Sequence, residues 1–281
     1  MRQDVSRGIR LLPAVLSLVI AFCGASCAPR IVALPSGDGT EFPDYAPAYE
    51  RATASCSSVR SLVAILSISG NAFRQRLRAK LDAGFEAPSR VRLELPAPGR
   101  PFFTFVANGT TATLLLPRDG RVLRDAPPAE TLEALAGVSV GPDDLRTIVA
   151  GCGFTIGPVT RARLFPGGWA AIYAERVTLW LQEVAGEWRL VVAVRTNAKG
   201  LAGPLEARYS DFVAGHPATI RLRALADFTR GESHANTDLT IRLSQVEVNQ
   251  PIDPAAFAVD IPADAVPITL DELRRAGPLG R

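Results

Sequence analysis

The sequence predicts a mainly β protein of the α+β class: a single strongly curved antiparallel sheet of about eleven strands, with a helical lid over its concave side. Strand-like runs follow one another at close spacing, separated by hairpin signals such as Asn108-Gly109 and Asp119-Gly120. Many runs alternate apolar and polar residues, and helical patterns interrupt them early, in the middle and at the end. Because a single sheet has one face to bury, helices or a ligand must cover its concave side.

The chain begins with the pattern of an export signal. Three arginines in the first ten residues precede the largely apolar run Leu11–Phe22, whose 12 residues are fewer than the roughly 20 needed to span a bilayer. The segment Gly24-Ala25-Ser26-Cys27 then resembles a bacterial lipobox, although Gly24 stands where Leu is usual. That resemblance implies cleavage before Cys27 and acylation of this cysteine. The alternatives are an ordinary secretory signal and, less suited because Phe22 would sit at the cut, acylation of Cys23.

We therefore divide the chain into a signal peptide, residues 1–26, a flexible tether rich in Pro and Gly, residues 27–48, and one domain, residues 49–281. The whole chain has 31 basic and 28 acidic residues, of which the signal holds three and one, so 28 and 27 remain. This balance gives no general attraction to nucleic acid, and we expect no nucleic-acid partner.

Two further cysteines remain, Cys56 and Cys152, and export would place them in an oxidising compartment. With Cys27 acylated and Cys23 removed, we predict that they form a disulfide. Closing a loop of about 95 residues stabilises a fold by roughly 4–5 kcal/mol in the chain-entropy description. Two separately buried free cysteines are the alternative.

The first helix and the first strand are predicted from the spacing of apolar residues, which changes from a helical period to a period of two. Residues Tyr49–Leu66 carry apolar side chains near one helical stripe, at Val59, Leu62, Val63 and Leu66. Along Phe73–Phe85, six of seven odd positions are apolar and five of six even positions are charged, which predicts a strand with one buried face. We interpret its four cations as a solvated sheet face that resists edge aggregation, with a phosphate-binding stripe as the alternative.

The remaining elements follow in order. Predicted strands after the first are Val91–Leu95, Phe102–Asn108, Thr111–Leu116, Val122–Leu123, Arg161–Phe165, Ala170–Glu175, Val177–Glu183, Glu187–Thr196, Leu205–Phe212, Thr219–Ala226, Asn236–Asn249 and Ala256–Ile261. Two helices, Pro128–Ala136 and Leu145–Ala150, interrupt them and form the predicted lid, and Leu270–Arg275 is a last helical turn.

Catalytic motifs are scarce. The two histidines, His216 and His234, lie on predicted turns outside any metal-ligand spacing, and the sequence contains neither a Gly-x-Ser-x-Gly elbow nor a phosphate loop. We expect no catalytic residue, metal or cofactor. An unrecognised hydrolase would need a Ser or Asp beside one of the histidines. The apolar surface in the strands favours binding over catalysis.

Several segments resemble a group of LolA-like bacterial lipoproteins. They are Arg92–Gly99, Leu114–Asp119, Gly151-Cys152-Gly153 and Asp271–Leu279. The order of helix, long strand, meander and mid-chain lid, over about residues 50–280, resembles the LolA/LolB superfamily of periplasmic lipoprotein carriers and outer-membrane lipoprotein receptors.

This resemblance implies a half-barrel whose concave face holds acyl chains of lipids or client lipoproteins beneath a lid that opens. The candidate lining residues are Phe73, Leu77, Leu81, Phe85, Leu93, Leu114, Val192 and Leu222. With Ala28 after the lipid cysteine, the resemblance implies a monomer anchored to the outer membrane through acylated Cys27 and facing the periplasm. The alternative is a structural or sensor lipoprotein whose half-barrel is filled by its own side chains.

Overall fold

The structure, a computed structural model, describes residues 33–73, 75–196, 204–224 and 237–276. The chain forms two compact units, Met1–Ser36 and Gly37–Arg281. Of the first unit, residues 33–36 are described. The predicted signal peptide, residues 1–26, and the predicted lipid-attachment residue Cys27 lie outside the described residues.

The folded unit starts earlier than predicted, because residues 37–48 of the expected tether belong to it. Strand β1, Thr40–Glu41, pairs with β8, and the ring of Phe42 lies 6.1 Å from that of Trp188. Helix α2, Tyr45–Ser57, follows directly. Partly buried aromatic side chains of this segment pack against the core and fix it in place. Its prolines do not prevent this, because Pro47 falls in the first turn of α2, where a missing N–H costs nothing.

The predicted class is confirmed: one curved, unclosed sheet contains the strands, each antiparallel to its neighbours except at β7 and β15. It has fifteen strands rather than about eleven, in the order β1-β8-β9-β10-β11-β12-β13-β14-β2-β3-β4-β5-β6-β7-β15. The bounds after β1 are β2 Ser61–Ala72, β3 Gln75–Glu86, β4 Arg90–Leu95, β5 Phe103–Asn108, β6 Thr111–Leu116, β7 Arg121–Ala126, β8 Val159–Phe165, β9 Trp169–Ala174, β10 Val177–Val184, β11 Glu187–Arg195, β12 Leu205–Val213, β13 His216–Ala224, β14 Thr237–Val248 and β15 Val266–Pro267.

The predicted helix over Tyr49–Leu66 is wrong in its second half, since α2 ends at Ser57 and β2 begins at Ser61. Strand β2 pairs with β3 on one side and with β14 on the other. Its inner side chains, Leu62 and Leu66, alternate with Val63 and Ile65, which are also apolar. Because the outer face of β2 is apolar as well, apolar and polar residues do not alternate along this strand. The spacing of its apolar residues fits a helix equally well.

The long charged strand is β3, but it begins at Gln75, and Phe73 lies in the turn after β2 with φ of 49°. The short strand predicted at Ala256–Ile261 is also wrong. The chain forms a 3-10 helix there, Pro254–Phe257, which is capped by the side chain of Asp253 and buries Phe257.

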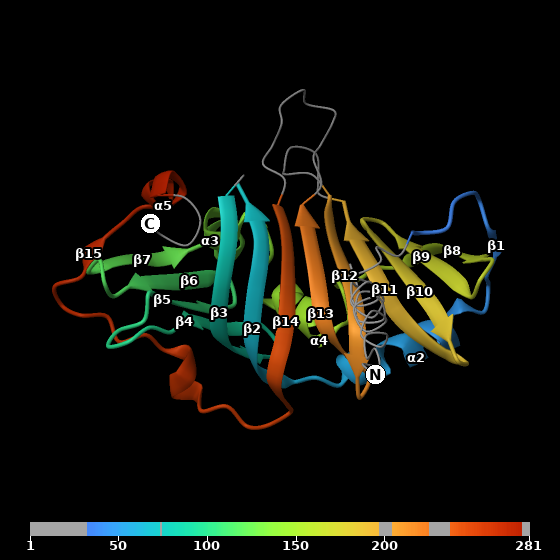
Figure 1. The fold of residues 1–281 in the computed structure, drawn as a ribbon, viewed down its shortest axis with the longest axis horizontal. Helices are drawn as coiled ribbons and strands as arrows, with labels where there is room; N and C mark the ends of the chain where they lie inside the picture. The colour runs from blue at the N-terminus through green and yellow to red at the C-terminus, as the bar shows by residue number, and fades with distance from the viewer. Residues whose placement is uncertain (1–32, 74, 197–203, 225–236, 277–281) are drawn as a thin grey trace, which may run out of the picture. The chain divides into compact units, whose positions relative to one another are not determined.

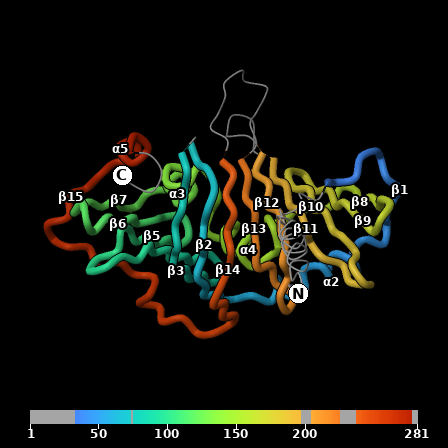
Figure 2. The backbone as a smooth tube through the Cα atoms, in the orientation of Figure 1, coloured from blue at the N-terminus to red at the C-terminus, as the bar shows by residue number. Residues whose placement is uncertain are grey.

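The predicted lid consists of α3, Pro128–Ala136, and α4, Pro142–Ala150. Each helix has a proline at its start and a left-handed glycine just past its end, which satisfies the usual rules for helix termini. In Figure 1 both helices lie behind the central strands, and Figure 2 shows the sheet curling back around them at both ends. The core lies between this concave face and the helices. Among the described helices, none is long and apolar enough to cross a membrane.

Candidate functional site

An apolar cavity lies between the concave face of the sheet and the lid. Its volume is about 70 Å³. The sheet contributes side chains from β2, β3, β4, β5, β13 and β14, and the lid contributes the rest. Every lining residue has a hydrocarbon side chain: Leu66, Ile68, Leu77, Ala79, Leu81, Leu93, Phe103, Leu132, Leu135, Ala136, Val138, Val140, Leu145, Val149, Leu222, Leu239 and Ile241.

The cavity is small for a ligand site in the state that the structure describes. Pockets for drug-sized ligands measure about 300–1,000 Å³, several times the 70 Å³ found here. The side chains of the lid occupy most of the space over the concave face. An acyl chain can enter it only if the lid moves.

Four of the eight lining residues predicted from the sequence border this cavity, namely Leu77, Leu81, Leu93 and Leu222. Two others, Phe85 and Leu114, are fully buried in the core but do not border the cavity. Phe73 lies in the turn between β2 and β3, where its ring approaches Gly137 at the end of α3.

The eighth, Val192, lies on the outer face of β11. It pairs with Trp180, whereas Ala193 pairs with Leu179. A Cβ built on Gly153, just after the lid, would lie 2.7 Å from the Cβ of Ala193 and 3.5 Å from Leu179, so this pair faces inward. A bulge shifts the register between Trp180 and Leu181, and Val192 therefore shares the outer face with Trp180 and does not line the cavity, contrary to the prediction.

The sequence prediction missed the part of the lining that comes from the lid, seven of the seventeen residues. Its helices present Leu132, Leu135 and Ala136 from α3, and Leu145 and Val149 from α4. These positions are three and four residues apart, which is the spacing of one helix face. The signal was present in the sequence, but nothing in it showed which face meets the sheet.

A partly buried arginine joins the lid to the sheet. The guanidinium of Arg195, on β11, donates to the carboxylate of Asp144 on α4 and, at 2.8 Å, to the carbonyl oxygen of Ser139 between the two helices. The side chains of Arg195 and Asp144 are 19% and 23% exposed. We call Arg195, Asp144 and Ser139 the lid clamp. Because these groups are largely shielded from water, their ion pair holds the lid more firmly than a surface pair does.

The two ends of the lid are attached differently. The predicted disulfide is present between Cys56 and Cys152, with 5.5 Å between the Cα atoms, and it ties α2 to the second residue after α4. At the other end, α3 contacts α5, Leu270–Ala276, and Glu130 forms a 2.8 Å ion pair with Arg274 at a solvent-exposed position. The α4 end is therefore covalently fixed, and the α3 end is held by weaker contacts.

Polar hollows lie elsewhere on the described surface. One of about 770 Å³, near the start of β2, includes Arg90, Glu86, Arg146 and Asp143. Four of its charged residues form pairs, Arg90 with Glu86 at 2.8 Å and Arg146 with Asp143 at 2.6 Å, whereas the exposed Arg60 has no ion pair among the described residues. This hollow is larger than the apolar cavity, but each of its two carboxylates is already paired with an arginine.

Of the two histidines, the structure describes His216. His216 begins β13, and its Nδ1 is buried without a hydrogen-bond partner. His234 lies outside the described residues. Over the part of the chain that is described, no group of three or more His, Cys, Asp or Glu side chains could hold a metal ion.

The sequence matches no protein-family model and no curated protein. Among solved structures, the chain is similar to a LolA superfamily protein from Nitrosomonas europaea, with a TM-score of 0.51 and 13% identity, over 75% of this chain and 96% of that one. A DUF1329 family protein from Desulfovibrio piger gives a TM-score of 0.48 and 11% identity, over 76% and 96%. The first likeness shows that the fold is LolA-like.

Proposed function

We propose that the chain is a non-catalytic lipid-binding protein of the bacterial cell envelope. It holds an acyl chain of a lipid or of a client lipoprotein between the concave face and the lid, in lipoprotein localisation or lipid transfer. The observation that carries this proposal is the lining of the cavity, which is hydrocarbon throughout. Each methylene group removed from water contributes about 0.8 kcal/mol, so an acyl chain binds such a surface without any polar contact.

Binding requires the lid to move, and its attachments define how. An acyl chain would replace Leu132, Leu135 and Leu145, which now cover the concave face. This exchanges one apolar contact for another, so the main cost is breaking the lid clamp at Arg195. Because Cys152 is tied to α2, the lid opens at its α3 end.

The proposed location rests on the start of the sequence. The lipobox-like segment ending at Cys27, followed by Ala28, supports acylation of Cys27 and anchoring to the outer membrane on its periplasmic side. The folded unit begins at Gly37. Ten residues span at most ~35 Å when fully extended, so the anchor keeps the binding domain close to the membrane.

A second candidate function is favoured by the small volume of the cavity, 70 Å³. In this alternative the lid does not move, the half-barrel is filled by its own side chains, and the protein is a structural or sensor component of the envelope.

Two measurements distinguish the lipid-binding protein from the self-filled half-barrel. They are native mass spectrometry of the full chain purified from cells and titration with a fluorescent fatty acid. We expect a co-purifying lipid and saturable binding. The variant Ala136→Leu enlarges a side chain that lines the cavity, and it should weaken binding of the fatty acid. Its matched control, Ala129→Leu, adds the same atoms to the same helix at a position outside the cavity lining, and it should bind like the unchanged protein.

Absence of both bound lipid and fatty-acid binding in a folded protein would refute the lipid-binding proposal and support the self-filled half-barrel. Equal weakening by Ala136→Leu and Ala129→Leu would show that the fatty acid binds outside this cavity.

A further inference from the structure

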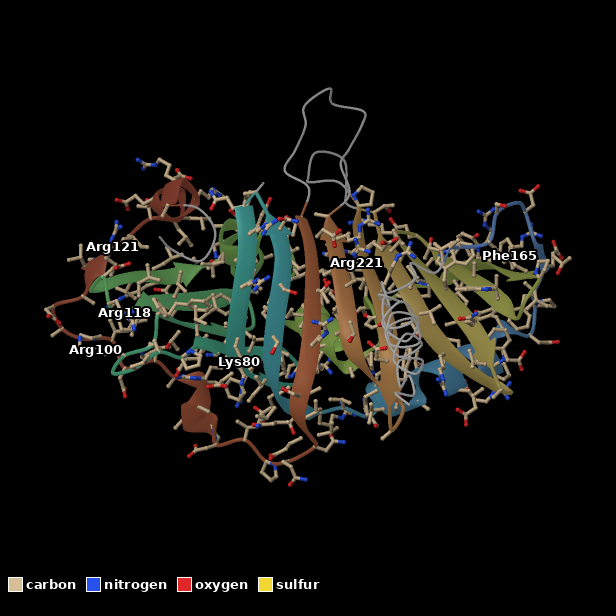
Figure 3. The ribbon with its side chains drawn as sticks, in the orientation of Figure 1. Lys80, Arg100, Arg118, Arg121, Phe165 and Arg221 are labelled. Atoms are coloured by element: carbon tan, nitrogen blue, oxygen red, sulfur yellow. A yellow bond between two sulfur atoms is a disulfide. The ribbon has the colours of Figure 1, made fainter. Side chains whose placement is uncertain are left out.

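Four cations gather on the outer face of the sheet, on the side opposite the cavity. Arg76, Arg78 and Lys80 project from β3, and Arg242 projects from β14. All four are exposed. We call these four residues the basic face. Lys80 is labelled in Figure 3, which views the sheet from this side.

The register of the sheet brings the cations together around two serines. Ser67 of β2 pairs with Lys80 on one side and with Arg242 on the other. Ser69 pairs with Arg78. Because serine is short, the longer side chains of Arg78, Lys80 and Arg242 surround a hollow of about 590 Å³ whose floor carries two hydroxyl groups. Arginine, lysine and serine hydroxyls all donate hydrogen bonds, so the hollow suits an anion.

Within the described part of the chain, none of the four cations of the basic face forms an ion pair. Two arginines farther along the same face, in contrast, do form ion pairs. Arg221 pairs with Asp238 at 2.6 Å, and Arg223 pairs with Glu206 at 3.4 Å. The bond from Arg221 lowers the pKa of Asp238, which keeps this carboxylate ionised. Like charges side by side on a sheet repel, so the unpaired cluster is stabilised by an external anion.

Protection of a sheet edge explains only part of the cluster. Strand β4 pairs with β3 from Asp82 onward, so the first half of β3 has no neighbour on that side, and charged residues there discourage aggregation. Arg242, however, lies on β14, which is paired with β13 and β2 on its two sides. Edge protection gives no reason for a cation at that position.

We propose that the basic face binds the phosphate groups of an anionic lipid bilayer. The hollow is open and extends over three strands of a broad sheet face, which suits a charged surface. Charge complementarity is local, because the chain without its signal carries nearly balanced charge. With the proposed anchor at Cys27, this contact would turn the outer face toward the membrane. The inference goes beyond lipid binding in the cavity and involves the opposite side of the sheet, so either can fail alone.

The test uses the full chain with Cys27→Ser, which cannot be acylated, and flotation with vesicles of phosphatidylcholine alone or mixed equally with phosphatidylglycerol. The signal, with its apolar run and three arginines, adds the same background to every variant. The readout is therefore the change in the ratio of affinities for the two vesicles between each variant and the chain that carries Cys27→Ser alone. We expect preference for the anionic vesicle and weaker binding as salt rises. Arg78→Gln, Lys80→Gln and Arg242→Gln together should reduce the preference on the order of 100-fold.

The matched control removes three cations elsewhere, with Arg100→Gln, Arg124→Gln and Arg163→Gln. It changes the net charge equally and should retain the preference. Equal binding to both vesicles would overturn the proposal, as would a control that loses as much as the basic-face variant. Circular dichroism and fatty-acid titration of each variant separate loss of this contact from loss of the fold or of the cavity.

Discussion

At the scale of single residues, Gly137 decides how closely the lid meets the sheet. It follows α3 with φ of 70°, a left-handed conformation that costs other residues about 1–2 kcal/mol. A Cβ at this position would also collide with Oγ1 of Thr237 on β14 and come within 3.5 Å of the ring of Phe73. The glycine is therefore required by backbone conformation and by space at once.

We expect Gly137→Ala to lower the free energy of unfolding by at least ~1–2 kcal/mol, because it combines left-handed strain with the contact at Thr237. Urea denaturation followed by circular dichroism measures the change. Gly157→Ala is the matched control: Gly157 has an ordinary backbone conformation and open space around its Cβ position. This control should stay within about 0.5 kcal/mol of the unchanged protein. If both variants were equally stable, Gly137 would not constrain the lid.

At the scale of elements, the disulfide gives the lid its fixed end. Cys56 and Cys152 are 96 residues apart, and a loop of that size corresponds to roughly 4–5 kcal/mol of chain entropy. We expect Cys56→Ala with Cys152→Ala to lower the free energy of unfolding by several kcal/mol. Urea denaturation measures it, and reductant added to the unchanged protein should have a similar effect. Reductant should leave the double variant unaffected; a further loss there would show that the disulfide is not the cause.

Elements were predictable where their two faces differ in polarity. Strand β3 carries charge on one face and apolar residues on the other, so its period was clear. The lid helices were marked by Pro128, Pro142 and the acidic first turn of α4. Strand β2 was not recognised, because Val63 and Ile65 make its outer face apolar too. The two-residue strands β1 and β15 have too few side chains to show any period.

The residues that line the cavity could be predicted from the sequence only where successive residues of a strand alternate regularly between the two faces of the sheet. Leu77 and Leu81 were assigned correctly to the concave face because β3 and β2 pair without a register shift. Val192 was assigned to the wrong face because a bulge intervenes in its pairing with β10. The contribution of Leu135 and Leu145 depends on how the helices dock, which is a long-range property of the fold.

At the scale of the whole sheet, an unclosed arrangement of fifteen strands leaves two edges to protect. Short strands cover both. β1 pairs with β8 through two residues, and β15 pairs in parallel with β7. Beside β7, the backbone N–H of Ile268 donates to the carbonyl oxygen of Val122 at 2.8 Å, and α5 continues the segment onto α3. The C-terminal segment thus covers an edge strand and one end of the lid together.

Leu273 holds this segment in place, since it is 1% exposed and belongs to the main core. Leu273→Asp would bury an unpaired carboxylate, so we expect α5 and β15 to detach and leave the edge of β7 open to pairing with a second copy. The unchanged protein should sediment as a monomer, whereas the variant should associate increasingly with concentration in sedimentation velocity. Arg275→Asp introduces the same residue at an exposed position of α5 and should remain monomeric. A monomeric Leu273→Asp would mean that the edge of β7 is protected without the C-terminal segment.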